Sequence, residues 1–291
     1  MIIAKKYKIL EHIGCGHFGS VFKGICLKPH KILAIKMERE NTKHSLLKHE
    51  ATVLHYLGTQ KCINIPHLFY YGLEKPNMYV IMSFFPQGSL DIWRPVLSLE
   101  EKIMWWNTAL DIIEHIHKAG IVHRDLKPQH FIRNENHEWH LIDFGLATSF
   151  LDESQEHIRE IPRDHIIGSP NYVSWFVHEG KDVVRRDDFL SLIYLFWELM
   201  YGSYLQPYEK SNTGISAAVL DEYNIWLRDQ KKFPRLYELL TRKNDNMVNF
   251  MISLISHAEE LKFKDKPNYF LFQLSLRGIP NIQNHLVYTG L

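Results

Sequence analysis

The fold is decided by residues 121–145, IVHRDLKPQHFIRNENHEWHLIDFG. Asp125 lies in a polar break, HRDLK, that follows a segment with the apolar spacing of a helix. Asp143 ends an apolar run and is followed directly by Phe144 and Gly145. Lys127 lies two residues after Asp125, where its ammonium could offset negative charge that develops in a reaction. The stretch therefore carries two carboxylates in different settings, which suit two different tasks.

Phosphoryl transfer from ATP needs such a pair, because one carboxylate orients the attacking hydroxyl and the other holds magnesium on the phosphates. The run HRDLK at 123–127, followed by DFG at 143–145, resembles the catalytic segments of protein kinases. Lys127 resembles the serine/threonine class rather than the tyrosine class. Either triplet alone could be a chance turn with a buried aspartate. Their order, with a helix before and a strand between, favours the kinase interpretation.

One position departs from the kinase pattern. The pattern has Asn five residues after the catalytic Asp, and here that residue is His130. The Asn is a second metal ligand in the template. Magnesium prefers hard oxygen ligands, whereas imidazole suits softer ions, so His130 weakens the expected second metal site and leaves manganese as an alternative ion. An attenuated kinase and a pseudokinase that binds or scaffolds both remain open.

Length and composition indicate a globular protein. The chain has 291 residues, 45% apolar and 23% charged, with a net charge of +1, which suits one large domain or two lobes. No basic or acidic run indicates nucleic acid or an anionic membrane as a partner. The first six residues become charged too early for a signal peptide. Three cysteines without metal spacing predict a reducing intracellular compartment, cytoplasmic or nuclear.

A glycine-rich stretch begins the chain's first predicted hairpin. Residues 13–21, IGCGHFGSV, fit the pattern G-x-G-x-x-G-x-V. Glycines let backbone amides approach phosphates closely. A dinucleotide-binding fold is the rival, but its motif opens a helix, whereas Val21 and the residues after it continue as a strand. Cys15 is expected to be a tolerated loop residue, with a redox-sensing thiol as the alternative.

Two charged residues follow in the kinase order. Lys36 is the only charge in the predicted strand 32–37, and it resembles the lysine that holds the α and β phosphates. Glu50 lies in a predicted helix over residues 42–57 that Gly58 would end. We expect Glu50 to pair with Lys36.

The predicted hinge lies at residues 83–88, where an apolar strand over 79–82 gives way to a Pro/Gly linker. Adenine is expected at the backbone near Phe84 and Phe85, with Met82 at the back of the pocket. A plain strand-to-helix loop is the alternative.

The second half of the chain narrows the resemblance. A capping box at residues 98–101 predicts a helix that runs to residue 118. The activation segment is expected at 147–172. The stretches GSPNYVS at 168–174 and RRDDFLSL at 185–192 resemble the casein kinase one group, which lacks the usual Ala-Pro-Glu. Asp188 matches that family's buried aspartate, which braces the catalytic loop backbone. The run KPNY at 266–269 resembles the group's last helix.

The resemblance does not carry over that group's acidic-substrate preference. At the positions judged to match the basic residues of the family's activation segment stand Ile161, Asp164 and Asn171.

These observations predict an α+β, bilobal protein-kinase fold. We expect a kinase domain at 1–278, with a β-rich N-lobe over about 1–82, a hinge at 83–88, a helical C-lobe at 89–278 and a short end at 279–291. The resemblance implies a monomeric serine/threonine protein kinase that uses ATP and Mg²⁺ on protein substrates. A small-molecule phosphotransferase is the least favoured alternative. The expected catalytic residues are Asp125, Lys127, Lys36 and Glu50, and the expected metal ligands are Asp143 and, as a weaker ligand for magnesium, His130. The expected nucleotide contacts are Ile13, Gly14, Cys15, Gly16, His17, Phe18, Gly19, Ser20, Val21, Ala34, Lys36, Met82, Phe84, Phe85, Ile132 and Ile142.

Overall fold

The computed structural model describes residues 1–16, 19–40, 46–202, 217–232, 235–238 and 246–277. The chain divides into two compact units. The first comprises Met1–Pro95 with Pro128–Thr148, and the second comprises Val96–Lys127 with Ser149–Leu291. The first unit is rich in strands and the second is mainly helical, which confirms the predicted α+β class.

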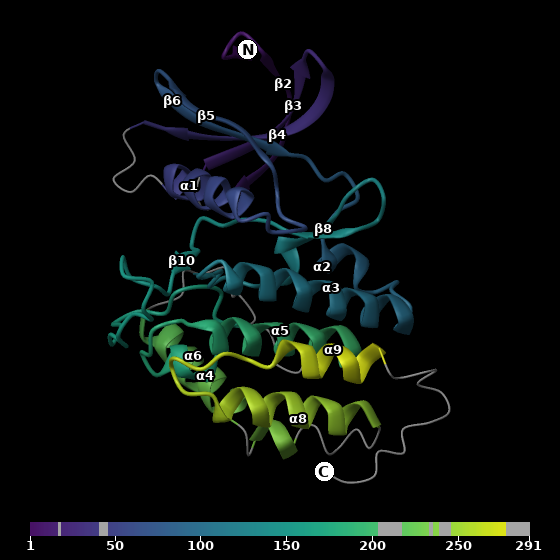
Figure 1. Ribbon diagram of the computed structural model, residues 1–291, viewed down its shortest axis with the longest axis vertical. Helices are drawn as coiled ribbons and strands as arrows, with labels where there is room; N and C mark the ends of the chain where they lie inside the picture. The colour runs from purple at the N-terminus through teal and green to yellow at the C-terminus, as the bar shows by residue number, and fades with distance from the viewer. Residues whose placement is uncertain (17–18, 41–45, 203–216, 233–234, 239–245, 278–291) are drawn as a thin grey trace. The chain divides into compact units, whose positions relative to one another are not determined.

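The first unit is built on a six-stranded sheet with the order β1-β2-β3-β4-β6-β5, in which every neighbouring pair is antiparallel (Figure 1). Helix α1 packs against β4, β5 and β6. A small hairpin of β8 and β9 and the short α2 belong to the same unit. The elements are β1 (Ile2–Ile3), β2 (Tyr7–Gly16), β3 (Gly19–Leu27), β4 (His30–Arg39), α1 (Leu46–Thr59), β5 (Leu68–Glu74), β6 (Asn77–Ser83), α2 (Leu90–Trp93), η1 (Pro128–His130), β8 (Phe131–Arg133) and β9 (Trp139–Leu141).

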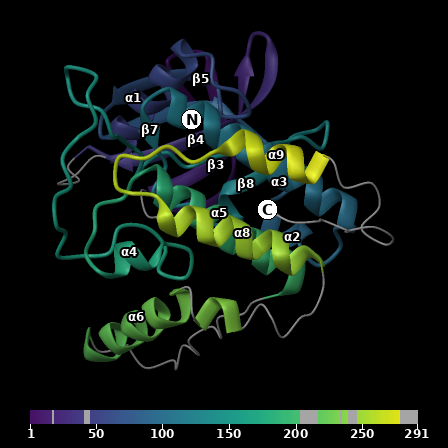
Figure 2. The same cartoon turned by 60° about the horizontal axis from the view of Figure 1, so that its bottom comes forward.

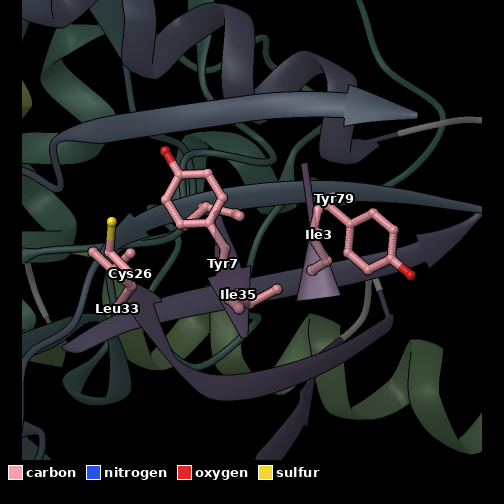
Figure 3. Close-up of a cluster of buried hydrophobic side chains, with 7 residues drawn as sticks. Ile3, Tyr7, Cys26, Leu33, Ile35 and Tyr79 are labelled. Atoms are coloured by element: carbon pink, nitrogen blue, oxygen red, sulfur yellow. The ribbon is translucent and has the colours of Figure 1, made fainter. Parts of the chain in front are cut away.

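One face of the sheet carries a compact apolar core. Because side chains alternate across a strand, residues two apart such as Leu33 and Ile35 share this face. Figure 3 shows them gathered with side chains from β1, β2, β3 and β6. The cluster consists of Ile3, Tyr7, Cys26, Leu33, Ile35, Tyr79 and Ile81, each at most 5% exposed. This packing holds β4, the strand that carries Lys36, in place.

The second unit is a set of packed helices. Helix α5 packs against α3 and α8, and α9 packs against α3 (Figure 1). Helix α6 packs against α4, as Figure 2 also shows. The elements are α3 (Leu99–Lys118), β7 (Ile121–Val122), α4 (Trp175–His178), α5 (Arg185–Tyr201), α6 (Ala217–Lys231), α8 (Asn246–Glu260) and α9 (Tyr269–Arg277), and β10 (Thr148–Ser149) lies at the boundary of the two units.

Local sequence signals explain where helix α3 begins and ends. The hydroxyl of Ser98 accepts from the amide of Glu101, and the Glu101 carboxylate accepts from the amide of Ser98, so the predicted capping box is present. Gly120, at a φ of 79°, follows the end of the helix. Helix α5 is apolar on most sides because it is buried on most sides.

Most predicted boundaries agree with the described elements, with one correction. Helix α1 runs to Thr59, so the predicted stop at Gly58 is wrong, and Gly58 lies within the last turn. The predicted start of that helix at residue 42 and the expected end at 279–291 lie outside the described residues. Among the described helices, none combines the length and the apolar character that crossing a bilayer requires.

Candidate active site

A cavity of about 440 Å³ lies within the first unit. Two predicted sets of residues line it, the glycine hairpin and the end of β6. Ser83 and Gln129 also line it, although sequence reasoning did not select them. The lining is not described at Gly16, and His17 and Phe18 lie outside the described residues. The predicted residues that line the cavity are Ile13, Gly14, Cys15, Gly19, Ser20, Val21, Ala34, Lys36, Met82, Phe84, Phe85, Ile132, Ile142 and Asp143.

The glycine hairpin is held by a close backbone approach. Gly16 pairs with Gly19 across β2 and β3. Gly19 has a φ of +118°, and a Cβ there would lie 2.2 Å from the carbonyl oxygen of Met37 on the neighbouring strand. A side chain at residue 19 is therefore excluded both by conformation and by space. At Gly14, by contrast, a Cβ would meet nothing within 4 Å.

Cys15 also lines the cavity. It is exposed, and its sulfur lies 3.4 Å from Nε2 of His12.

Lys36 lies between two carboxylates. Its Nζ donates to both carboxylate oxygens of Glu50, at 2.6 and 2.8 Å, and to Oδ1 of Asp143 at 3.3 Å. The pairing of Lys36 with Glu50 expected from the sequence is thus present. Burial alone would lower the pKa of Lys36, but the charges of Glu50 and then Asp143 outweigh it and raise that pKa. Lys36 is therefore a charged ammonium whose position is fixed by Glu50 on α1 and by Asp143.

His130 contacts the same aspartate. Its Nε2 lies 3.2 Å from Oδ2 of Asp143, and the His130 side chain is 6% exposed. Asp143 has a φ of 68°, a left-handed conformation that few residues other than glycine adopt. Within the described ranges there is no group of three or more His, Cys, Asp or Glu side chains that could hold a metal ion by themselves. Asp143 and His130 are thus a pair of such side chains and not a complete ligand set of this kind.

In the second unit, Asp125 is held by two donors. Nζ of Lys127 lies 2.9 Å from Oδ2, and the hydroxyl of Ser169 donates to Oδ1 at 2.6 Å. Ser169 belongs to the stretch 168–174 that the sequence singled out, but no role was assigned to it. Its neighbour Gly168 has a φ of +101° and approaches the carbonyl of Arg124 closely, which brings Ser169 to the catalytic loop. No local sequence signal points to this contact, because the two residues lie 44 positions apart.

The backbone before Asp125 rests on a buried carboxylate. Asp188 accepts from the amide of His123 at 2.6 Å and from the amide of Arg124 at 2.9 Å. It also accepts from Nε2 of His117 at 3.0 Å. The expected bracing of the catalytic loop by Asp188 is therefore present, while the link to His117 was not foreseen.

The segment that contains Ser169 is anchored at two further points. Arg163 donates to both oxygens of Asp182, each at 3.0 Å. The fully buried Lys231 donates to the carbonyls of Pro170 at 2.6 Å and Val173 at 2.7 Å. The ion pair and the buried lysine thus fix the segment around Ser169 to other residues of the second unit.

The geometry leads to one class of protein. A glycine hairpin, a lysine shared by two carboxylates, and an HRDLK loop braced from α5 are the parts of a phosphoryl-transfer fold. A family model described as "Protein kinase domain" matches residues 7–263. The chain belongs to the protein kinase family, whose members are phosphotransferases with protein substrates.

Proposed function

We propose that this chain is an ATP-dependent serine/threonine protein kinase whose rate is reduced by His130. The observation that carries the proposal is the position of Lys36, within hydrogen-bonding distance of both Glu50 and Asp143 in a cavity lined by the glycine hairpin. That arrangement offers a fixed cation for the α and β phosphates and a carboxylate for the metal ion. The cavity volume of about 440 Å³ suits a ligand of nucleotide size.

The residues present fit one magnesium ion better than two. The Asp143 side chain is 24% exposed and supplies hard oxygen ligands. His130 supplies a nitrogen where the template has an amide oxygen. A second magnesium ion would therefore be held poorly, and a manganese ion would be held better than magnesium. When bound, the ion would neutralise charge on the phosphates. Apolar side chains such as Ala34, Val21 and Ile142 line the cavity and would pack against adenine.

On the substrate side, we propose that Asp125 orients a serine or threonine hydroxyl of a protein substrate. Lys127 and Ser169 fix both oxygens of Asp125, so its orientation is set before a substrate arrives. Lys127 also carries the proposal of the serine/threonine class, and the stretch at 185–192 carries that of a casein kinase one-like group. The three free thiols support a reducing location, in the cytoplasm or nucleus.

A pseudokinase that binds nucleotide is the second candidate, and one observation favours it. His130 occupies one oxygen of Asp143 at 3.2 Å, where a metal ion would otherwise bind. If this contact persists in solution with nucleotide present, the chain would bind ATP without transferring phosphate.

A transfer assay with radiolabelled ATP distinguishes the two candidates. Wild type and Asp125→Asn would be compared with magnesium and with manganese, alongside the thermal shift that nucleotide induces. Transfer by wild type that is lost in Asp125→Asn supports the kinase. A thermal shift without transfer for either metal supports the pseudokinase, and the absence of both would rule out the nucleotide site.

A further inference from the structure

Helix α9 (Tyr269–Arg277) lies beyond residue 263, where the match to the protein kinase domain ends. Its first residue, Tyr269, is nevertheless 1% exposed. The helix packs against α3, and Phe272 one turn later is buried as well. A segment outside the matched region thus places a polar side chain in the interior of the second unit.

Tyr269 begins a chain of buried hydrogen bonds that ends on the catalytic loop. Its hydroxyl is bonded to Nδ1 of His117 on α3. Nε2 of His117 lies 3.0 Å from Oδ2 of Asp188 on α5. Asp188 in turn accepts from the amides of His123, at 2.6 Å, and Arg124, at 2.9 Å. Three helices therefore meet in one network directly before Asp125.

The hydrogen-bond roles along this chain follow from protonation. Burial lowers the pKa of His117, so the ring is neutral and carries a single N–H. Burial raises the pKa of Tyr269, so its hydroxyl keeps its proton and can donate. Asp188 can only accept. The consistent assignment is Tyr269 donating to Nδ1 and His117 donating from Nε2, so the hydroxyl selects the tautomer that can bond to Asp188.

We propose that Tyr269 is a positioning residue for the catalytic loop, acting through His117 and Asp188. Without the hydroxyl, Nδ1 of His117 becomes a buried acceptor with no donor, and the other tautomer, with its proton on Nδ1, loses the bond to Asp188. The carboxylate that holds the amides of His123 and Arg124 is then less fixed. The kinetic part of this inference rests on the proposed function, whereas the structural part does not.

Tyr269→Phe isolates the hydroxyl because the ring remains. The ring packs at 6.1 Å from Phe189 and 5.8 Å from His117, between centroids, and those contacts are kept. Phe272→Leu is the matched control on the same helix, since it weakens apolar packing and removes no hydrogen bond. In the full chain, hydrogen exchange of the amides of His123 and Arg124 would be measured for both variants.

Tyr269→Phe is expected to speed exchange at these two amides well beyond any change in the six-stranded sheet. It is also expected to lower kcat by roughly three- to thirty-fold with KM for ATP unchanged, the range typical of coupling through a network. Phe272→Leu should lower Tm without this selective effect. In a His117→Gln background, adding Tyr269→Phe should change neither exchange nor kcat, because the hydroxyl then has no imidazole to act on.

Unchanged exchange at His123 and Arg124 in Tyr269→Phe, or the same selective effect in Phe272→Leu, would overturn the proposal. If wild type transfers no phosphate, the exchange comparison still decides the role of Tyr269, and only the proposed function fails.

Discussion

Nε2 of His130 lies 3.2 Å from Oδ2 of Asp143, on the carboxylate whose other oxygen contacts Lys36. His130 stands where the kinase template has an Asn that binds a second ion, and here it contacts Asp143, the proposed ligand of the first ion. Under the proposed function, a metal ion at Asp143 would compete with imidazole, and we expect this competition to limit the rate.

Replacing His130 by Asn is expected to raise magnesium-dependent transfer, by up to roughly 100-fold, because an amide oxygen is a harder ligand than imidazole. The ratio of manganese to magnesium activity should fall in the same variant. Initial rates with each metal at saturating ATP would measure both. His137→Asn is the control, since His137 is exposed and its φ of 64° suits Asn. A rate that does not rise in His130→Asn would contradict the attenuated-kinase interpretation.

Glu50→Gln removes one partner of a nearly buried ion pair, in which the side chains of Lys36 and Glu50 are 16% and 1% exposed. We expect the free energy of unfolding to fall by about 2–3 kcal/mol, slightly less than for a fully buried pair because Asp143 still contacts Lys36. Urea unfolding would measure this. Glu114→Gln breaks an ion pair to Lys118, which is 55% exposed, and should cost less than about 0.5 kcal/mol. Equal losses of unfolding free energy in the two variants would contradict the claim that burial makes the Lys36–Glu50 pair the more costly one to break.

The resemblance to kinases predicted this pair, and the local strand and helix periods agree with it. Alternation places Lys36 on one face of β4, and helical spacing places Glu50 on the inner face of α1. The resemblance also supplied most of the predicted cavity lining, because its motifs lie in or next to such elements. Contacts that depend on the path of an irregular segment were not accessible in this way. The bonds of Ser169 to Asp125 and of Tyr269 to His117 join residues 44 and 152 positions apart, and no local period reports them.

Ser169→Ala removes the hydroxyl that donates to Asp125 at 2.6 Å. We expect kcat to fall roughly ten-fold, because one oxygen of Asp125 loses its fixed donor and the orientation of the carboxylate loosens. Ser169→Thr keeps the hydroxyl and should retain most of the rate. Steady-state kinetics on both variants would test this. Ser174→Ala instead removes a helix cap and the hydroxyl that donates to the buried carboxylate of Asp187. It should lower stability by about 2 kcal/mol or more without lowering kcat of the folded protein.

The stability of the fold should depend on His178 below neutral pH. Burial, and next the charge of Lys231, lower the pKa of His178 from 6.5 to about 3. Between these values the unfolded chain binds a proton that the folded chain does not. This contribution to stability is therefore present above pH 6.5 and is lost as the pH falls toward 3, with a slope of at most about 1.4 kcal/mol per pH unit.

His178→Gln should flatten that dependence. The difference in the free energy of unfolding between pH 7 and pH 5 is expected to shrink by about 2 kcal/mol relative to wild type. Urea unfolding at several pH values would measure it. His137→Gln, at an exposed position, should leave the wild-type dependence in place. A dependence that is the same in His178→Gln and wild type would show that this histidine titrates as in the unfolded chain.

Gly19→Ala should destabilise the first unit, because a Cβ would lie 2.2 Å from the carbonyl oxygen of Met37 at a φ of +118°. The expected cost is about 2 kcal/mol or more, together with a weaker thermal shift by ATP. Gly14→Ala is the control in the same hairpin, where a Cβ meets nothing within 4 Å, and it should cost far less. Equal costs at the two positions would indicate that the hairpin moves to accept a side chain.

The thiol of Cys15 allows binding in the cavity to be measured by chemical labelling, without an assay of phosphate transfer. It is exposed among the residues that line the cavity, whereas Cys26 is buried and Cys62 is partly buried. A maleimide should therefore label this sulfur first, and a ligand that fills the cavity should slow the labelling. Occupancy of the proposed nucleotide site can thus be titrated by mass spectrometry even in a variant that transfers no phosphate.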